Sequence, residues 1–362
     1  MSRMFFLVLL VLVVTTLLHT SGKSTECDSF DDVNVQVVEM DGRQSNETVN
    51  GCLERKRFHE KTVTAVFIIH QKIPRLGKDS VRHLVRLETI SFWGCELDSI
   101  EPRAFRNLPR LKNVQISYCD LKEIPKGVFN LIPSMELLRI HNNKIDFIEN
   151  QAFANLSSLK KVFGSDNALE YWHREWFDDS PNLEIMDFQN NKIRTIPRKA
   201  FAALQKLKQI YFDYNEIATI QSEAFVGLKN LEYLGLRNNR LKAIEEHIFP
   251  TGLKIRSLLI SANYLNYLSN EVLKKISVSD IVLEYNPWKC PCLDRIHYWI
   301  YTNNGTLRTT EQCKSSYVPI CAYPKSFSQT CLEYVDEELT QRYIGMLRNL
   351  SAHLDDYCAR LD

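Results

Sequence analysis

Apolar residues recur along this chain with a period of 24 residues, in the pattern L-x-x-L-x-L-x-x-N-x-L. The clearest copy is LEYLGLRNNRLKAIEEHIF, residues 231–249. Copies begin at Val63, Leu87, Leu111, Met135, Leu159, Leu183, Leu207, Leu231 and Ile255, and a truncated one begins at Val278, one residue early. In each copy the alternating stretch x-L-x-L-x predicts a short strand with its leucines on one face. A single unit cannot bury that face alone, so the period predicts a stack of units around one continuous core.

Two further columns repeat at the same interval. Eighteen residues after each start from Leu87 to Leu231 lies a phenylalanine, at positions 105, 129, 153, 177, 201, 225 and 249, which we expect to stack as a spine. The ninth residue is an asparagine at positions 143, 167, 191, 215, 239, 263 and 286, and its amide can satisfy backbone groups in a buried turn. Cys95 and Cys119 occupy the ninth position in two adjacent units. We expect them to be free buried thiols; the alternative is a disulfide between neighbouring turns.

The repeats resemble those of the extracellular leucine-rich-repeat family over about residues 63–290. The resemblance implies an α/β repeat solenoid, a horseshoe with disulfide-bonded caps and about nine to ten short parallel strands on its concave side. We divide the chain accordingly into a signal peptide (1–22), an N-terminal cap (23–62), the repeats (63–286), a cysteine-rich C-terminal cap (287–334) and an amphipathic helix (335–362).

The stretch NPWKCPC, residues 286–292, begins at the ninth position of the last unit, where the stack ends. Apolar residues at 293, 296, 299 and 300 then follow the spacing of an amphipathic helix that can cover the open end. A zinc or redox site is a poor fit in an oxidising compartment, and we expect neither metal nor cofactor. The motif resembles the C-terminal cap of the family, which implies that Cys290, Cys292, Cys321 and Cys331 pair among themselves. Cys27 and Cys52 resemble an N-terminal cap disulfide.

Cys313 and Cys358 depart from that four-cysteine pattern. Apolar residues of segment 335–362 form a stripe about 100° wide, too wide for a coiled-coil seam, which favours a helix folded back on the cap. The chain somewhat resembles mosquito leucine-rich-repeat immune proteins, but it lacks the long coiled coil that those append. We expect a Cys313–Cys358 bond within a monomer; the alternative is a dimer linked through Cys358.

The first 22 residues carry one basic residue, Arg3, before an apolar run from Met4 to Val14 and a small polar end, which predicts a secretory signal peptide. We therefore expect a secreted, extracellular protein without a membrane anchor. Without Arg3 the 45 basic residues become 44 and equal the 44 acidic ones, so neither nucleic acid nor an anionic membrane is an expected partner. Four N-glycosylation sequons begin at Asn46, Asn155, Asn304 and Asn349.

The third, fifth, seventh and eighth residues of each unit are expected to face outward on the concave side. An apolar group lies near the N-terminal end, and aromatic residues lie beside carboxylates in mid-arc, a composition typical of protein-binding surfaces. The candidate ligand-binding residues are Phe67, Ile69, Trp93, Arg139, His141, Phe163, Asp187, Tyr211, Asp213 and Tyr233. Single exposed aromatics are also ordinary, so it is their number on one face that favours a ligand surface.

The unit that begins at Leu159 departs from the pattern, because Gly164 replaces an inward leucine and Trp172 lies where most units have isoleucine. We expect Trp172 to fill the missing volume. The alternative is a local distortion at a binding site.

No catalytic motif is present: the sequence has no G-x-S-x-G, no H-E-x-x-H and no glycine loop that cradles phosphate. We expect a protein that is not an enzyme and that binds a protein ligand on its concave face, with a role in innate immunity or extracellular signalling. The alternative is a matrix protein whose repeats serve assembly.

Overall fold

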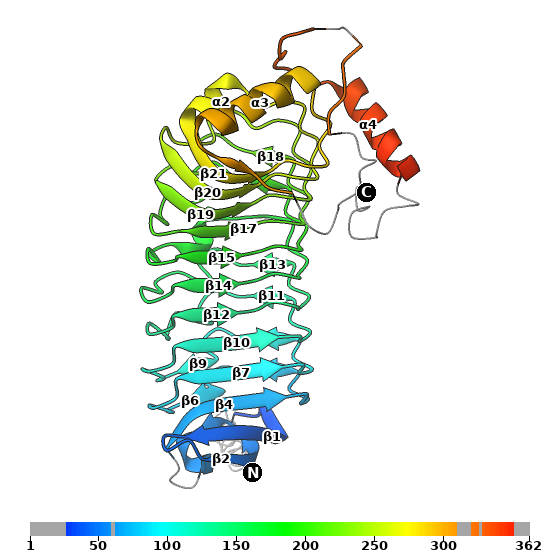
Figure 1. The fold of residues 1–362 in the computed structure, drawn as a ribbon. Coiled ribbons are helices and arrows are strands. Elements are labelled where there is room, and N and C mark those ends of the chain that lie inside the picture. The colour runs from blue at the N-terminus through cyan, green and yellow to red at the C-terminus, as the bar shows by residue number, and fades with distance from the viewer. Residues whose placement is uncertain (1–26, 59–61, 310–319, 326–327, 351–362) are drawn as a thin grey trace, which may run out of the picture.

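The predicted repeat strands form one continuous sheet. The structure, a computed structural model, describes residues 27–58, 62–309, 320–325 and 328–350. In spatial order the 13 strands of the main sheet are β2 (Gln44–Gly51), β1 (Phe30–Glu39), β4 (Val63–Ile69), β7 (Thr89–Trp93), β10 (Asn113–Ser117), β12 (Leu137–Arg139), β14 (Lys161–Phe163), β15 (Ile185–Asp187), β17 (Gln209–Tyr211), β19 (Asn230–Gly235), β20 (Leu253–Leu259), β21 (Ile276–Val282) and β22 (Thr306–Leu307). Figure 1 shows them stacked one above another along the molecule.

The ten strands from β4 to β21 come from the ten units and are parallel, as predicted. Paired residues lie 24 apart, for example Val114 opposite Ile90, and the interval falls to 23 between Ile255 and Val278 where the last unit begins early. A hairpin of β1 and β2, not predicted from the sequence, pairs antiparallel with β4 and covers that end of the stack.

Shorter elements complete each unit on the return path. Small parallel sheets are formed by β3 (Leu53–Glu54), β6 (Val81–Arg82) and β9 (Phe105–Arg106); by β5 (Arg75–Leu76) and β8 (Ser99–Ile100); by β11 (Glu123–Ile124) and β13 (Phe147–Ile148); and by β16 (Thr195–Ile196) and β18 (Thr219–Ile220). The helices are η1 (Arg55–Phe58), η2 (Arg174–Phe177), α2 (Asn270–Lys275), α3 (Cys290–Thr302) and α4 (Glu337–Leu350).

The phenylalanine spine is present and fully buried. Neighbouring rings from Phe105 to Phe177 lie 5.3–6.2 Å apart, and those from Phe201 to Phe249 lie 5.2–5.3 Å apart. Between the two runs the ring of Trp172 lies 6.0 Å from Phe177 and 5.8 Å from Phe201, so it bridges the spine.

The space beside Gly164 is filled by a residue other than the one expected. A Cβ on Gly164 would lie 2.7 Å from the ring of Phe188, which occupies the equivalent inward position of the next unit. Trp172 packs edge-on against Phe188, with ring centroids 5.1 Å apart. The prediction that Trp172 itself fills this space is therefore wrong in its residue, because the ring of Phe188, directly after the adjoining strand β15, occupies it.

The ninth-position asparagines form the expected buried ladder. Asn215 donates from its amide nitrogen to the carbonyls of Phe188, Phe212 and Asp213, and its oxygen accepts from the backbone of Ile193. Cys95 and Cys119 are free, buried thiols in the same column. The Cys95 thiol donates to the carbonyl of Ile68, 27 residues earlier, just as the Asn215 amide donates to Phe188.

Disulfides close both caps. Cys27 bonds to Cys52, whereas Cys290 bonds to Cys321 and Cys292 to Cys331, which gives the connectivity that the sequence left open. In α3, the side chains of Leu293, Ile296 and Ile300 are buried against the last unit, and Trp299 is partly buried there. The predicted signal peptide and the predicted Cys313–Cys358 bond lie outside the described residues.

The C-terminal amphipathic segment forms α4 and folds back on the stack. Its buried residues Tyr343 and Leu347 form a small apolar cluster with Tyr285, against which Ala262 also packs. Asn266 accepts a hydrogen bond from the backbone of Asp336 and donates one to Thr340. Figure 1 shows α4 on the side of the molecule toward which the arrows of β4, β7 and β10 point.

Candidate binding surface

The outward positions of the main sheet carry all ten candidate residues. Phe67 and Ile69 lie on β4, Trp93 on β7, Arg139 on β12, Phe163 on β14, Asp187 on β15, Tyr211 on β17 and Tyr233 on β19, while His141 and Asp213 follow β12 and β17 directly. Their backbone register places equivalent residues of successive units side by side. The structure divides them into an N-terminal and a C-terminal group, with Arg139 and Phe163 between the two.

The N-terminal aromatic cluster comprises Ile69, Trp93, Tyr118 and His141. The ring of Tyr118 lies 4.3 Å from that of Trp93 and 5.7 Å from that of His141, and the Trp93 and His141 rings are 6.3 Å apart. Ser117 is fully buried, and its backbone pairs with that of Trp93 on the neighbouring strand. The rings of Trp93, Tyr118 and His141 thus gather around the short side chain of Ser117. Ile69 remains 45% exposed and Tyr118 49% exposed.

Tyr118 is not among the candidate residues predicted from the sequence. It is the eighth residue of its unit, and the eighth residue has a positive φ in every unit, from 50° at Ala262 to 63° at Gly94. Asparagine, aspartate and glycine suit this left-handed conformation, whereas a tyrosine adopts it at a cost of about 1 kcal/mol. A tyrosine at the eighth position therefore marks a candidate binding residue, but only when the left-handed conformation of that position is known.

His141 is held in a defined orientation. The amide nitrogen of Asn142 donates to its Nδ1 over 3.1 Å, which places the proton of the neutral ring on Nε2. Burial, and then the positive charge of Arg139, lower the pKa of His141 below its ordinary value, so the ring is neutral at physiological pH. The guanidinium of Arg139 lies 5.6 Å from the centre of the Phe163 ring, a cation–π contact.

The C-terminal group consists of Asp187, Tyr211, Asp213 and Tyr233, and its buried polar groups find their bonding partners within the protein. The rings of Tyr211 and Tyr233 stack at 4.3 Å, and the Tyr233 hydroxyl donates to Asp213 over 3.3 Å. Asp213 also accepts from the backbone N–H of Arg237 at 3.0 Å and is within 3.5 Å of the Arg237 guanidinium. Its side chain is fully buried, so the Asp213 carboxylate is not exposed on the outward face of the sheet. Gly235 makes this burial feasible, because a Cβ there would overlap the Asp213 carboxylate.

Burial changes the ionisation of both aspartates. Burial raises the pKa of Asp213 to about 6, opposed by the charge of Arg237, and raises the pKa of Asp187 to about 6, with the nearby Asp213 charge acting in the same direction. Burial also raises the pKa of Tyr233, and the Asp213 charge adds to the effect. Asp187, which is partly exposed, is the carboxylate of this group that a ligand can reach.

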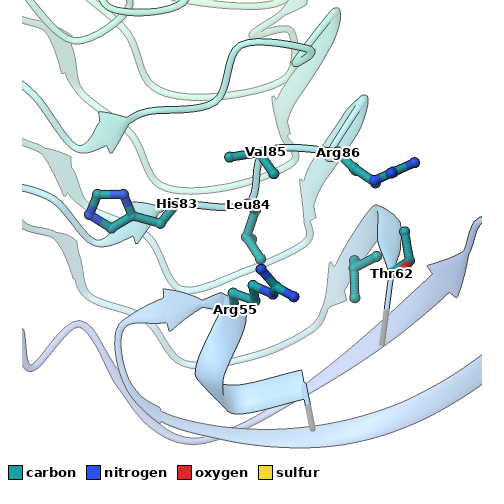
Figure 2. A pocket seen from close by; sticks show the side chains of 7 residues that line it. Arg55, Thr62, His83, Leu84, Val85 and Arg86 are labelled. Atoms are coloured by element: carbon teal, nitrogen blue, oxygen red, sulfur yellow. The ribbon is translucent and has the colours of Figure 1, made fainter. Parts of the chain in front are cut away.

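A pocket of about 340 Å³ lies at the start of β4 and is lined by Arg55, Thr62, Val63, His83, Leu84, Val85 and Arg86. Figure 2 shows that the Arg86 side chain extends away from Arg55 and His83, so the basic groups do not converge on one point. We do not assign it a ligand.

The four sequon asparagines, Asn46, Asn155, Asn304 and Asn349, are all exposed. Within the described part of the chain, no three histidine, cysteine, aspartate or glutamate side chains are placed to hold a metal ion. No helix in that part is long and apolar enough to span a bilayer.

Comparison with known proteins identifies the repeats. A family model described as leucine rich repeat matches residues 165–217 and 181–241, and one described as BspA type leucine rich repeat region matches residues 53–184. A crystal structure of a TLR13–ssRNA13 complex is similar, with 25% identity and a TM-score of 0.55, over 60% of this chain and 33% of that one. The mouse RP105/MD-1 complex is similar in fold, with 20% identity and a TM-score of 0.55, over 71% of this chain and 44% of that one. The chain thus spans less than half the length of either neighbour. No curated protein matches the sequence.

Proposed function

Because the chain belongs to the leucine-rich-repeat family, we propose that it is a protein-binding module that holds a protein ligand against the outward face of its parallel sheet. The observation that carries this proposal is the N-terminal aromatic cluster, in which Trp93, Tyr118 and His141 pack on one another while Ile69 and Tyr118 stay largely exposed. Tryptophan and tyrosine dominate the binding energy of protein interfaces, and rings that are already held in place lose little entropy on binding.

The leucine-rich-repeat fold serves generally as an interaction scaffold, so we assign the chain a binding rather than a catalytic role. Of the two structural neighbours, TLR13 is in complex with single-stranded RNA and RP105 is in complex with the protein MD-1. A net charge of +1 over 362 residues favours a protein over a polyanion as the ligand of this chain. We place its role in innate immunity or extracellular signalling.

Secretion is part of the proposal. Three disulfides staple the two caps, and disulfides persist in oxidising compartments. The four exposed sequons and the apolar N-terminal segment agree with export. The alternative is a matrix or assembly protein, which would remain in the detergent-insoluble fraction, whereas a freely soluble secreted chain would favour the ligand-binding role.

A capture experiment tests the proposed function. The tagged full chain is incubated with extracellular fluid, and bound proteins are identified by mass spectrometry alongside the Trp93→Ala variant. The matched control is Tyr171→Ala, which removes an aromatic residue that is 64% exposed and outside the cluster. We expect a protein that binds the wild type and Tyr171→Ala and is lost with Trp93→Ala. Equal capture by all three chains would exclude the cluster as the binding surface.

A further inference from the structure

The chain contains its own example of how a helix docks on the repeat turns. Tyr285 is the eighth residue of the last unit, with a φ of 59°, and it is only 9% exposed because α4 lies against it. From α4, Tyr343 and Leu347 reach this tyrosine, and they are one helical turn apart. The unfavourable backbone of Tyr285 is thus offset by apolar contact with a helix.

Tyr118 has the same place in its own unit but lacks such a cover. Its φ is 57°, yet 49% of it is exposed. The rings of Trp93 and His141 flank it at 4.3 and 5.7 Å and fix its orientation. Tyrosine is poorly suited to this backbone conformation, so its side chain has to offset the cost by apolar contacts. About half of the Tyr118 surface makes no such contact within the described part of the chain.

The turns offer no backbone row with which an extended peptide could pair. The N–H of His70 donates to Trp93, that of Gly94 to Ser117, and that of Tyr118 to His141. A strand that docked here would leave its own N–H and C=O groups without partners on this surface. A helix brings its backbone hydrogen bonds with it, so it can bury an apolar stripe against the rings.

We propose that the N-terminal aromatic cluster docks an α-helix of a protein partner, one that presents an aromatic residue and a leucine one turn apart, as Tyr343 and Leu347 do in α4. This inference rests on the proposed function and names the kind of partner segment that the surface binds. The three rings of the cluster come from three successive units, whose strands β7, β10 and β12 span about 10 Å at ordinary strand spacing, which matches about two helical turns. A neutral His141 suits an apolar rather than a charged stripe.

The test uses a labelled peptide with the α4 sequence, EELTQRYIGMLRNL, stapled between the exposed positions Glu338 and Arg342 so that it is helical in solution. Its binding to the full chain is followed by fluorescence anisotropy. We expect Trp93→Ala and Tyr118→Asn each to weaken binding at least about tenfold, equivalent to about 1.4 kcal/mol. Tyr118→Asn removes the ring but suits the left-handed backbone, so loss of folding does not explain a loss of binding. Tyr171→Ala is the control and should bind as the wild type does.

Two further arms examine the helix itself. A peptide with Gly345→Pro keeps both anchor residues but cannot stay helical, and it should not bind. The variant Tyr285→Ala should bind the stapled peptide at the wild-type cluster with unchanged affinity, because that cluster is remote from α4.

Absence of peptide binding, equal binding by Trp93→Ala and Tyr118→Asn, or equal binding of the proline peptide would each overturn the helix proposal. If a protein is still captured from extracellular fluid and lost with Trp93→Ala, the helix proposal fails alone and the proposed function stands. If neither experiment shows binding at the cluster, both fail.

Discussion

Each asparagine of the ninth column connects neighbouring turns through one side chain. Asn215 makes hydrogen bonds of 3.0–3.3 Å to three carbonyls and one backbone N–H, and Asn191 and Asn239 do the same in the adjoining units. No other side chain of this size carries two donors and an acceptor in one rigid plane. A thiol satisfies fewer groups, so Cys95 and Cys119 are weaker members of the ladder.

Replacement of Asn215 by alanine should lower the free energy of unfolding by about 3 kcal/mol, because buried carbonyls and an N–H group lose their partners. Urea titration followed by circular dichroism measures this loss. The control Asn230→Ala removes an exposed asparagine and should stay within about 0.5 kcal/mol of the wild type. Equal stability of the two variants would show that water replaces the ladder bonds.

The strands and the phenylalanine spine depend on each other. Each strand is only a few residues long, and on its own it would be unstable in water. The spine rings pack on the return path of the seven units that begin at Leu87 to Leu231, and Trp172 connects the run that ends at Phe177 with the run that starts at Phe201. Aromatic packing thus continues through the one unit in which an inward leucine is missing.

Phe201→Ala should cost roughly 3–5 kcal/mol, because it leaves a cavity among Trp172, Phe212 and Phe225. Thermal unfolding followed by circular dichroism should show a clearly lower midpoint. An exposed control is Phe147→Ala, since Phe147 is 53% exposed and should tolerate the change. An unchanged midpoint for Phe201→Ala would mean that the spine assignment is wrong.

Across the whole molecule, the outward face combines an exposed aromatic cluster near one end with a buried carboxylate network further along. The pKa of Asp187 is about 6 in the folded protein and close to 3.9 in an unfolded chain. The folded state therefore holds this proton more tightly than the unfolded state, and its stabilising contribution is present at low pH. That contribution is lost as the pH rises from about 4 to about 6.

Asp187→Asn removes the free-energy cost of ionising a buried carboxyl group, because the amide stays neutral at every pH. The stability of the variant relative to the wild type should therefore increase as the pH rises from 4 to 7 and stay constant above that. Differential scanning calorimetry at unit steps of pH measures the difference. The matched control is Asp146→Asn, the same change at an exposed aspartate. A stability difference between Asp187→Asn and the wild type that does not change with pH would show that burial does not raise the pKa of Asp187.

The repeat period and the family resemblance were enough to predict the stack, about nine to ten strands and their spacing, the spine and the asparagine ladder. These features follow from local rules applied at a fixed interval, since a unit that pairs with its neighbour 24 residues away meets the same residue types each time. The family resemblance added the cap cysteines, and their pairing then depended on how α3 and the following loop bring the thiols together.

The surface was predictable only in part. Sequence position showed which residues leave the core, such as Trp93, Asp187 and Asp213, but not how far each is exposed. Exposure depends on neighbours from other units: the Tyr233 and Arg237 side chains bond to Asp213, whose carboxylate occupies the space that the missing side chain of Gly235 leaves. The role of Tyr118 likewise required the left-handed turn conformation and the ring positions of Trp93 and His141, which arise only when three units are stacked.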